Sequence, residues 1–304
     1  MAKITAAVVK ELRAKTGAGM MDCKRALVAT GADIEAAVDW LRKQGVAVAT
    51  KKAGRAASDG LIGVAVTQRK AAIVEINSET DFVARSDAFQ ETVRAIATVA
   101  LDSGTDLEAL KSEAYPGADG TVADSLFQLV AKVGENIQLR RVAGLTVEQG
   151  ALAAYVHGAL APGLGRIGVL VALESEGDAG TLAAFGKRVA MHVAAARPRA
   201  LTRNDVSPAA LERERAVLAE QTRASGKPEN IVEKMIEGRL RKFYEEVVLL
   251  DQVYVIDGKS KLSEAIEEAA RDIGAPIRIS GFVRFALGEA VGTDESDGAA
   301  AADS

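Results

Sequence analysis

Apolar residues recur at the spacing of helix turns in three stretches within the first fifty positions. Ile4, Val8 and Leu12 lie four residues apart, and Cys23 and Leu27 repeat that spacing in a second stretch. A third stripe follows at i, i+3, i+4 and i+7: Ile34, Ala37, Val38 and Leu41. Such stripes predict amphipathic helices, here each too short to be stable alone. We therefore expect a compact three-helix module over residues 1–54, which ends in a basic, flexible linker at Lys51–Arg55.

After Gly60 the apolar period changes from that of a helix to that of a strand. Ile62, Val64 and Val66 alternate with smaller residues, and residues 71–76 form a second apolar run beyond a polar turn. This pattern predicts an antiparallel β-hairpin. Two helices and a strand complete a first core subdomain over residues 55–147, and we place them at 87–101, 122–133 and 136–147.

A second α+β subdomain is predicted over residues 148–287. Its expected strands are 151–157, 167–173 and 277–287, and its expected helices are 182–196, 208–224 and 228–250. The last two helices flank Ser225–Pro228, a helix-breaking turn, so they predict a helical hairpin over 208–250. Its apolar stripe fits either a protruding, coiled-coil-like arm or an ordinary amphipathic helix on its own core. The predicted fold class is α+β with antiparallel sheets.

Composition excludes several classes of protein. The chain has 304 residues with 48% apolar and 26% charged side chains, which is typical of globular domains. The net charge is −4, and residues 288–304 hold five acidic and no basic side chains, which leaves +1 for the rest. We expect this tail to be disordered, and we expect no direct contact with nucleic acid. One cysteine, no leader pattern and no apolar run of about 18 residues predict a soluble, cytoplasmic protein without membrane contact.

The chain offers little candidate chemistry. Gly163–Gly168 matches G-x-G-x-x-G, the fingerprint of nicotinamide-dependent enzymes, but the residues that follow alternate like a strand and not like the required helix. His157 and His192 lack partners at metal-ligand spacing, and His192 and Cys23 fit apolar packing positions. We therefore predict no cofactor, no metal site and no enzyme active site, and we interpret the glycines as a loop between two strands.

Phe82 stands out because it follows a polar turn in a chain with only 4% aromatic residues. One interpretation is that Asp81 with Ser78 caps a helix and Phe82 folds back on that helix as a hydrophobic staple. The other is that Phe82 projects outward and fills a pocket on a partner protein. The residues alone leave both interpretations open.

Several stretches, taken together and in order, resemble bacterial translation elongation factor Ts. Two match its signature regions, LRAKTGAGMMDCKRAL (Leu12–Leu27) and NSETDFVAR (Asn77–Arg85). Further matches are KVGENIQLRRV (Lys132–Val142), RIGVLVAL (Arg166–Leu173), AMHVAA (Ala190–Ala195) and SGKPENIVEKMIEGRLRKF (Ser225–Phe243). The resemblance spans residues from about 3 to 288. It implies a guanine-nucleotide exchange factor for the GTPase elongation factor Tu, with a UBA-like N-terminal module and a helical arm for self-association.

The resemblance also implies roles for individual residues. It places Thr80, Asp81, Phe82 and Val83 next to the nucleotide of the partner, where they would dislocate Mg²⁺. The resemblance thus favours the interpretation in which Phe82 projects outward as a wedge over the one in which it is a staple. Further partner contacts are implied at Arg13, Met20, Met21, Lys24, His157, Met235 and Ile236. Because Met20 and Met21 are adjacent, we expect one to pack inside and the other to reach out. A rival interpretation, a ubiquitin-type adaptor, uses only residues 1–50 and leaves 77–85 unexplained.

Overall fold

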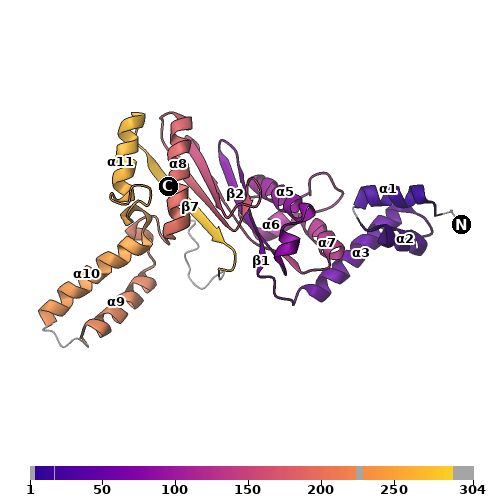
Figure 1. The fold of residues 1–304 in the computed structure, drawn as a ribbon, viewed down its shortest axis with the longest axis horizontal. Helices are drawn as coiled ribbons and strands as arrows, with labels where there is room; N and C mark the ends of the chain where they lie inside the picture. Colours follow the sequence, from indigo (N-terminus) through magenta and orange to yellow (C-terminus); the bar gives the residue numbers. More distant parts are fainter. Residues whose placement is uncertain (1–3, 17, 224–228, 290–304) are drawn as a thin grey trace.

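The computed structural model describes residues 4–16, 18–223 and 229–289. Figure 1 shows an elongated molecule with three parts arranged along its length. A group of three helices lies at one end, a core of sheets and helices follows, and a pair of long helices extends from the other end. The predicted α+β class is confirmed.

The three predicted N-terminal helices are present. They are α1 (Ala6–Thr16), α2 (Met20–Ala29) and α3 (Ile34–Lys52). Leu12, Cys23 and Leu27 are fully buried between them, so the cysteine is a packing residue as predicted. Asp33 caps α3 because its carboxylate accepts a hydrogen bond from the Ala36 amide at 3.0 Å. The likeness of this module to ubiquitin-associated domains stays a prediction.

Helix α3 joins the module to the core by packing, and the flexible linker expected at Lys51–Arg55 is wrong for its first two residues. The helix continues through Lys52 and lies against α7 (Val122–Val133). Arg42 donates two hydrogen bonds of 2.7 Å, from Nε and Nη2, to the Asp124 carboxylate on α7. At Gly45 a Cβ would lie 3.4 Å from the Phe127 carbonyl oxygen, so the two helices approach closely.

The first half of the core is a four-stranded antiparallel sheet covered by helices. Its order is β3-β2-β1-β5, with β1 (Asp59–Val66), β2 (Lys70–Ser78), β3 (Ile137–Thr146) and β5 (Leu164–Gly165). The predicted hairpin is confirmed, because Asp59 pairs with Ser78 and Val66 with Ala71. A helical layer packs on one face: α4 (Asp81–Ala84), α5 (Asp87–Ser103), α6 (Leu107–Ser112) and α7. The sequence patterns missed α4, α6 and β5.

The second half repeats this plan with three antiparallel strands in the order β4-β6-β7. They are β4 (Gly150–His157), β6 (Ile167–Glu174) and β7 (Arg278–Ala286). Helix α8 (Ala179–Ala196) and helix α11 (Leu262–Ile273), which was not predicted, pack on one face. Strand β5, although it belongs to the second half of the chain, pairs with β1 in the first sheet.

The free faces of the two sheets pack against each other. Ile62 and Ile73 of the first sheet meet Leu170 and Val283 of the second in one buried cluster. Gly168 is needed at this contact, since a Cβ there would lie 2.6 Å from Ile62 Cγ2. The core therefore has four layers: helices, sheet, sheet and helices.

A buried ion pair lies within the first sheet, and its arginine also bonds to the second sheet. The Glu75 carboxylate on β2 is fully buried and accepts a 2.6 Å hydrogen bond from Arg141 Nε on β3. Arg141 Nη2 donates to the Ala286 carbonyl of β7 at 3.2 Å. A buried charge is tolerated only when it is paired and hydrogen-bonded, and this arrangement fixes one sheet against the other.

Helices α9 (Pro208–Arg223) and α10 (Glu229–Val247) lie side by side and extend away from the sheets (Figure 1). Arg239 Nη1 donates to Gln221 Oε1 at 3.1 Å across the pair. This favours the protruding arm over a helix packed on the main core. Two short 3-10 segments, Arg203–Asp205 and Leu249–Asp251, flank the pair at its base. The turn predicted at Ser225–Pro228 and the tail beyond 289 lie outside the described residues.

Candidate protein-docking site

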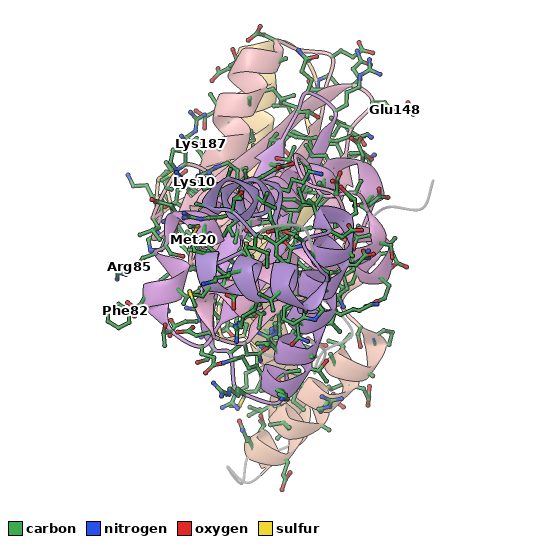
Figure 2. The ribbon with its side chains drawn as sticks, turned by 90° about the vertical axis from the view of Figure 1, so that its right-hand side faces the viewer. Lys10, Met20, Phe82, Arg85, Glu148 and Lys187 are labelled. Atoms are coloured by element: carbon green, nitrogen blue, oxygen red, sulfur yellow. The ribbon has the colours of Figure 1, made fainter. Side chains whose placement is uncertain are left out.

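Phe82 projects from the surface at the end of the first hairpin. Its side chain is 81% exposed, the most exposed large apolar side chain of the part described. It lies on α4, a single turn between the end of β2 and the start of α5. Figure 2 shows the ring at the edge of the molecule, pointing away from the body. The interpretation of Phe82 as a staple that folds back is therefore wrong.

The turn that carries Phe82 is fixed at both ends. Thr80 is the N-cap, and its Oγ1 accepts a 3.5 Å hydrogen bond from the Val83 amide. At the other end Ser86 Oγ donates to the Val83 carbonyl at 2.7 Å. Val83 and Ala84 pack into the core of the first half, so the same turn that exposes Phe82 buries its neighbours. The exposed ring is thus held by a rigid support.

Ser78 and Asp81 do not form the helix cap that was one interpretation of this segment. Ser78 is buried and donates from Oγ to the Thr80 carbonyl at 2.9 Å, so it is not the cap. Asp81 is the first helical residue, and its Oδ2 accepts a 3.2 Å hydrogen bond from Arg85 Nε. Both charged side chains are partly exposed, so this pair orients them more than it stabilises the fold.

Sequence reasoning missed Glu135, which contacts this site from a distant part of the chain. Its carboxylate accepts two hydrogen bonds from Thr80, from the backbone amide at 3.0 Å and from Oγ1 at 2.7 Å. The neighbouring Asn136 amide donates to Glu79 Oε1 at 2.6 Å. In the sequence, Glu135 and Asn136 form a polar pair after Gly134, which ends α7 in a left-handed conformation, and they lie within the matched stretch Lys132–Val142. Nothing in that pattern points to Thr80, 55 residues away.

The N-terminal module presents the other predicted contact residues to solvent. Arg13 and Lys24 are exposed. Met20 is 41% and Met21 68% exposed, so the expectation that one of them packs inside is wrong. Figure 2 shows Met20, Lys10, Phe82 and Arg85 along the same side of the molecule. This side therefore carries apolar side chains from two separate parts of the fold.

The remaining predicted residues lie in the second half of the chain. His157 is exposed at the end of β4, and its Nδ1 lies 3.2 Å from the Tyr155 hydroxyl. Met235 and Ile236 are half-buried on α10, a helix that Figure 1 places at the opposite end of the molecule from α1 and α2. The structure does not bring these three residues together with Phe82, so a partner that touched all of them would have to span much of the molecule.

The dinucleotide interpretation fails on geometry. Gly163 has a φ of 74° in the loop before β5, and β6 begins at Ile167, so the glycines join strands as predicted and do not open a helix. His192 is fully buried, with Nε2 3.0 Å from Gln252 Oε1 and Nδ1 accepting from the Val255 amide at 3.2 Å. Burial lowers the pKa of His192, which is the packing residue that was predicted.

Two further kinds of feature, a metal-ion cluster and a membrane-spanning helix, are not found in the described residues. No group of three or more His, Cys, Asp or Glu side chains among them is arranged to hold a metal ion. None of the helices described has the length and apolar content to cross a membrane. The outstanding feature of this part of the chain is thus a surface with an exposed aromatic side chain, an arrangement suited to binding another protein.

Comparison with known proteins identifies the chain. A family model described as "Elongation factor TS" matches residues 79–289. An elongation factor Ts of Rhodospirillum rubrum is 58% identical over 301 residues, which cover 99% of this chain and 97% of that protein. One of Rhodospirillum centenum is 58% identical over 300 residues, covering 99% and 98%. One of Brucella anthropi is 58% identical over 297 residues, covering 98% and 97%.

These matches place the chain in a class and in a family. The class is that of translation elongation factors, which act in protein biosynthesis. Within that class, the chain belongs to the elongation factor Ts family.

Proposed function

We propose that the chain is a guanine-nucleotide exchange factor for elongation factor Tu. The observation that carries this proposal is the 81% exposed Phe82 on a turn fixed at both ends. Large aromatic side chains of this kind are typical anchors at the centre of protein interfaces. The proposed anchor enters a pocket of the GTPase near its bound GDP, with Thr80, Asp81 and Val83 at its sides.

Insertion of Phe82 disturbs the Mg²⁺ ion and the phosphate site of the partner. Mg²⁺ bridges protein and phosphate oxygens in such GTPases, so its dislocation weakens the binding of GDP. Exchange then requires only differential binding. A factor that binds the nucleotide-free GTPase more tightly than the GDP form must weaken GDP by the same ratio. No covalent bond is made or broken, so the proposed action is not enzymatic chemistry.

Other surfaces extend the proposed contact with elongation factor Tu. Arg13, Met20, Met21 and Lys24 supply it from the N-terminal module, whose position is fixed by the packing of α3 on α7. His157 and the Met235–Ile236 pair supply it from the second half of the chain, and the arm formed by α9 and α10 serves self-association. We place this activity in the cytoplasm, without direct contact with nucleic acid or membrane.

The proposal is tested by the release of fluorescent GDP from purified elongation factor Tu, with this protein added in sub-stoichiometric amounts and unlabelled GTP in excess. The expected result is faster release, in which each copy of the protein discharges many copies of the GTPase. Stoichiometric binding without faster release would leave a binding partner that is not an exchange factor. The absence of any complex would refute the proposal altogether.

A further inference from the structure

The turn between α7 and β3 holds the segment that precedes Phe82. Glu135, in this turn, accepts hydrogen bonds from both the backbone amide and the hydroxyl of Thr80, at 3.0 and 2.7 Å. Bonds from neutral donors to a carboxylate are stronger than those between neutral groups. The next residue, Asn136, is 2% exposed, and its backbone amide donates a 2.6 Å hydrogen bond to Glu79 Oε1. Glu135 and Asn136 thus hold the adjacent residues Thr80 and Glu79.

Helix α4 depends on such outside support because it has only four residues, Asp81–Ala84. One helical turn gains too few internal hydrogen bonds to offset the entropy of ordering its backbone. Thr80 is the residue where the turn begins, so its position sets the direction in which α4 leaves β2. The Glu135 carboxylate contacts Thr80 on two atoms and therefore fixes both its backbone and its side-chain rotamer.

The same turn also contacts the end of the N-terminal module. Asn136 Nδ2 donates to the Arg55 carbonyl at 2.7 Å, and Lys52 on α3 donates to the Gly134 carbonyl. Arg55 Nη1 in turn lies 3.5 Å from Glu79 Oε1. Residues 134–136 therefore support Phe82 and the module that carries Met20 and Met21 at once, and so set the spacing between the two exposed apolar groups.

We propose that Glu135 is a positioning residue for nucleotide exchange: it holds Thr80 so that Phe82 meets the partner in register with the N-terminal module. This inference rests on the proposed exchange function. The proposed role of Glu135 affects the rate of exchange more than the binding of the partner. Without the carboxylate, the module still docks on the GTPase, but Phe82 is presented in many orientations and rarely reaches its pocket. The maximal rate of GDP release then falls, while the concentration of factor that gives half of that rate changes little.

The test compares wild-type protein with Glu135→Ala, Glu135→Gln and the control Glu267→Ala, which removes an exposed carboxylate from α11. GDP release from elongation factor Tu is measured over a range of factor concentrations. For Glu135→Ala we expect a maximal rate lower by about 10- to 100-fold, the size of effect that misplacement of a reacting group produces. Glu135→Gln should recover part of this loss, because its amide oxygen still accepts from the Thr80 amide. Glu267→Ala should match wild type.

Hydrogen–deuterium exchange on the free protein separates positioning from unfolding. We expect faster exchange at residues 80–85 in Glu135→Ala, with unchanged protection of β1 and β2. An unchanged maximal rate in Glu135→Ala, while wild type is active, would overturn the positioning role alone. If wild type itself does not accelerate release, the proposed function fails and takes the role in exchange with it. Unchanged protection of residues 80–85 would show, in either case, that Glu135 does not hold the turn.

Discussion

Replacing Phe82 with alanine removes the exposed ring without touching the core. In the free protein the side chain is 81% exposed, so a partner pocket would newly bury about 160 Å² of the roughly 200 Å² that a phenylalanine covers. At about 25 cal/mol per Å², and with the Cβ retained, the loss is about 3–4 kcal/mol, or roughly 10²–10³-fold in exchange efficiency. The stability of the free protein should change by less than about 0.5 kcal/mol, because the ring makes little contact with the fold.

The assay measures GDP release at limiting factor concentration, together with a urea denaturation curve for each variant. Val66→Ala is the matched control. Val66 is also exposed, at 42%, and lies at the far end of the same strand pair, seven residues or about 23 Å from Asp59. We expect Val66→Ala to exchange nucleotide at the wild-type rate. Equal rates for Phe82→Ala and wild type would refute the anchor, and a large loss of stability in Phe82→Ala would refute the claim that the ring is outside the core.

Two further predictions concern the fold. Asp124→Ala removes the capping box with Thr121 and the pair with Arg42, and should cost about 2–3 kcal/mol in a urea titration, the Arg42 share being reduced by solvent. Burial raises the pKa of Asp124, but hydrogen bonds from Thr121 and Arg42 outweigh it and hold the pKa below 3.8. This support is therefore present above pH 3.8 and lost as the pH falls through the folded-state value. Burial lowers the pKa of His192 below 6.5, so the unfolded chain binds the extra proton and stability falls as the pH drops below about 6.5. His192→Gln should lose this dependence and His157→Gln should keep it; identical profiles for both variants would contradict the assignment.

Sequence patterns predicted most elements because their periodicity is strong and local. Helix α7 has the predicted bounds, Val122–Val133, since Thr121 caps its start and Gly134 ends it. Strand β2 was recognised from the apolar run that follows Lys70. Helix α11 was missed although Leu262, Ala265 and Ile266 mark a buried stripe, because no standard cap precedes it: Lys261 occupies the N-cap position.

What sequence patterns could not supply is contact between distant segments. The two-residue strand β5 has no periodicity to detect, and it pairs across the boundary between the two halves of the chain. Glu75 sits in an apolar run, and its burial is explained by Arg140 and Arg141 from another strand, which pair with its two carboxylate oxygens. The candidate site shows the same division. The motif around Phe82 is local and was found, whereas Glu135 contacts it only through the fold.

An exchange factor and GDP must each weaken the binding of the other to elongation factor Tu, and a measurement of this linkage tests the proposed function directly. The measurement is the dissociation constant of this protein for the GTPase, determined once without nucleotide and once with saturating GDP, alongside that of GDP with and without this protein. We expect that GDP weakens the binding of this protein, and that this protein weakens the binding of GDP by the same factor. Equal affinity for the nucleotide-free and GDP-bound GTPase would contradict it, because a factor that binds both forms equally shifts no equilibrium.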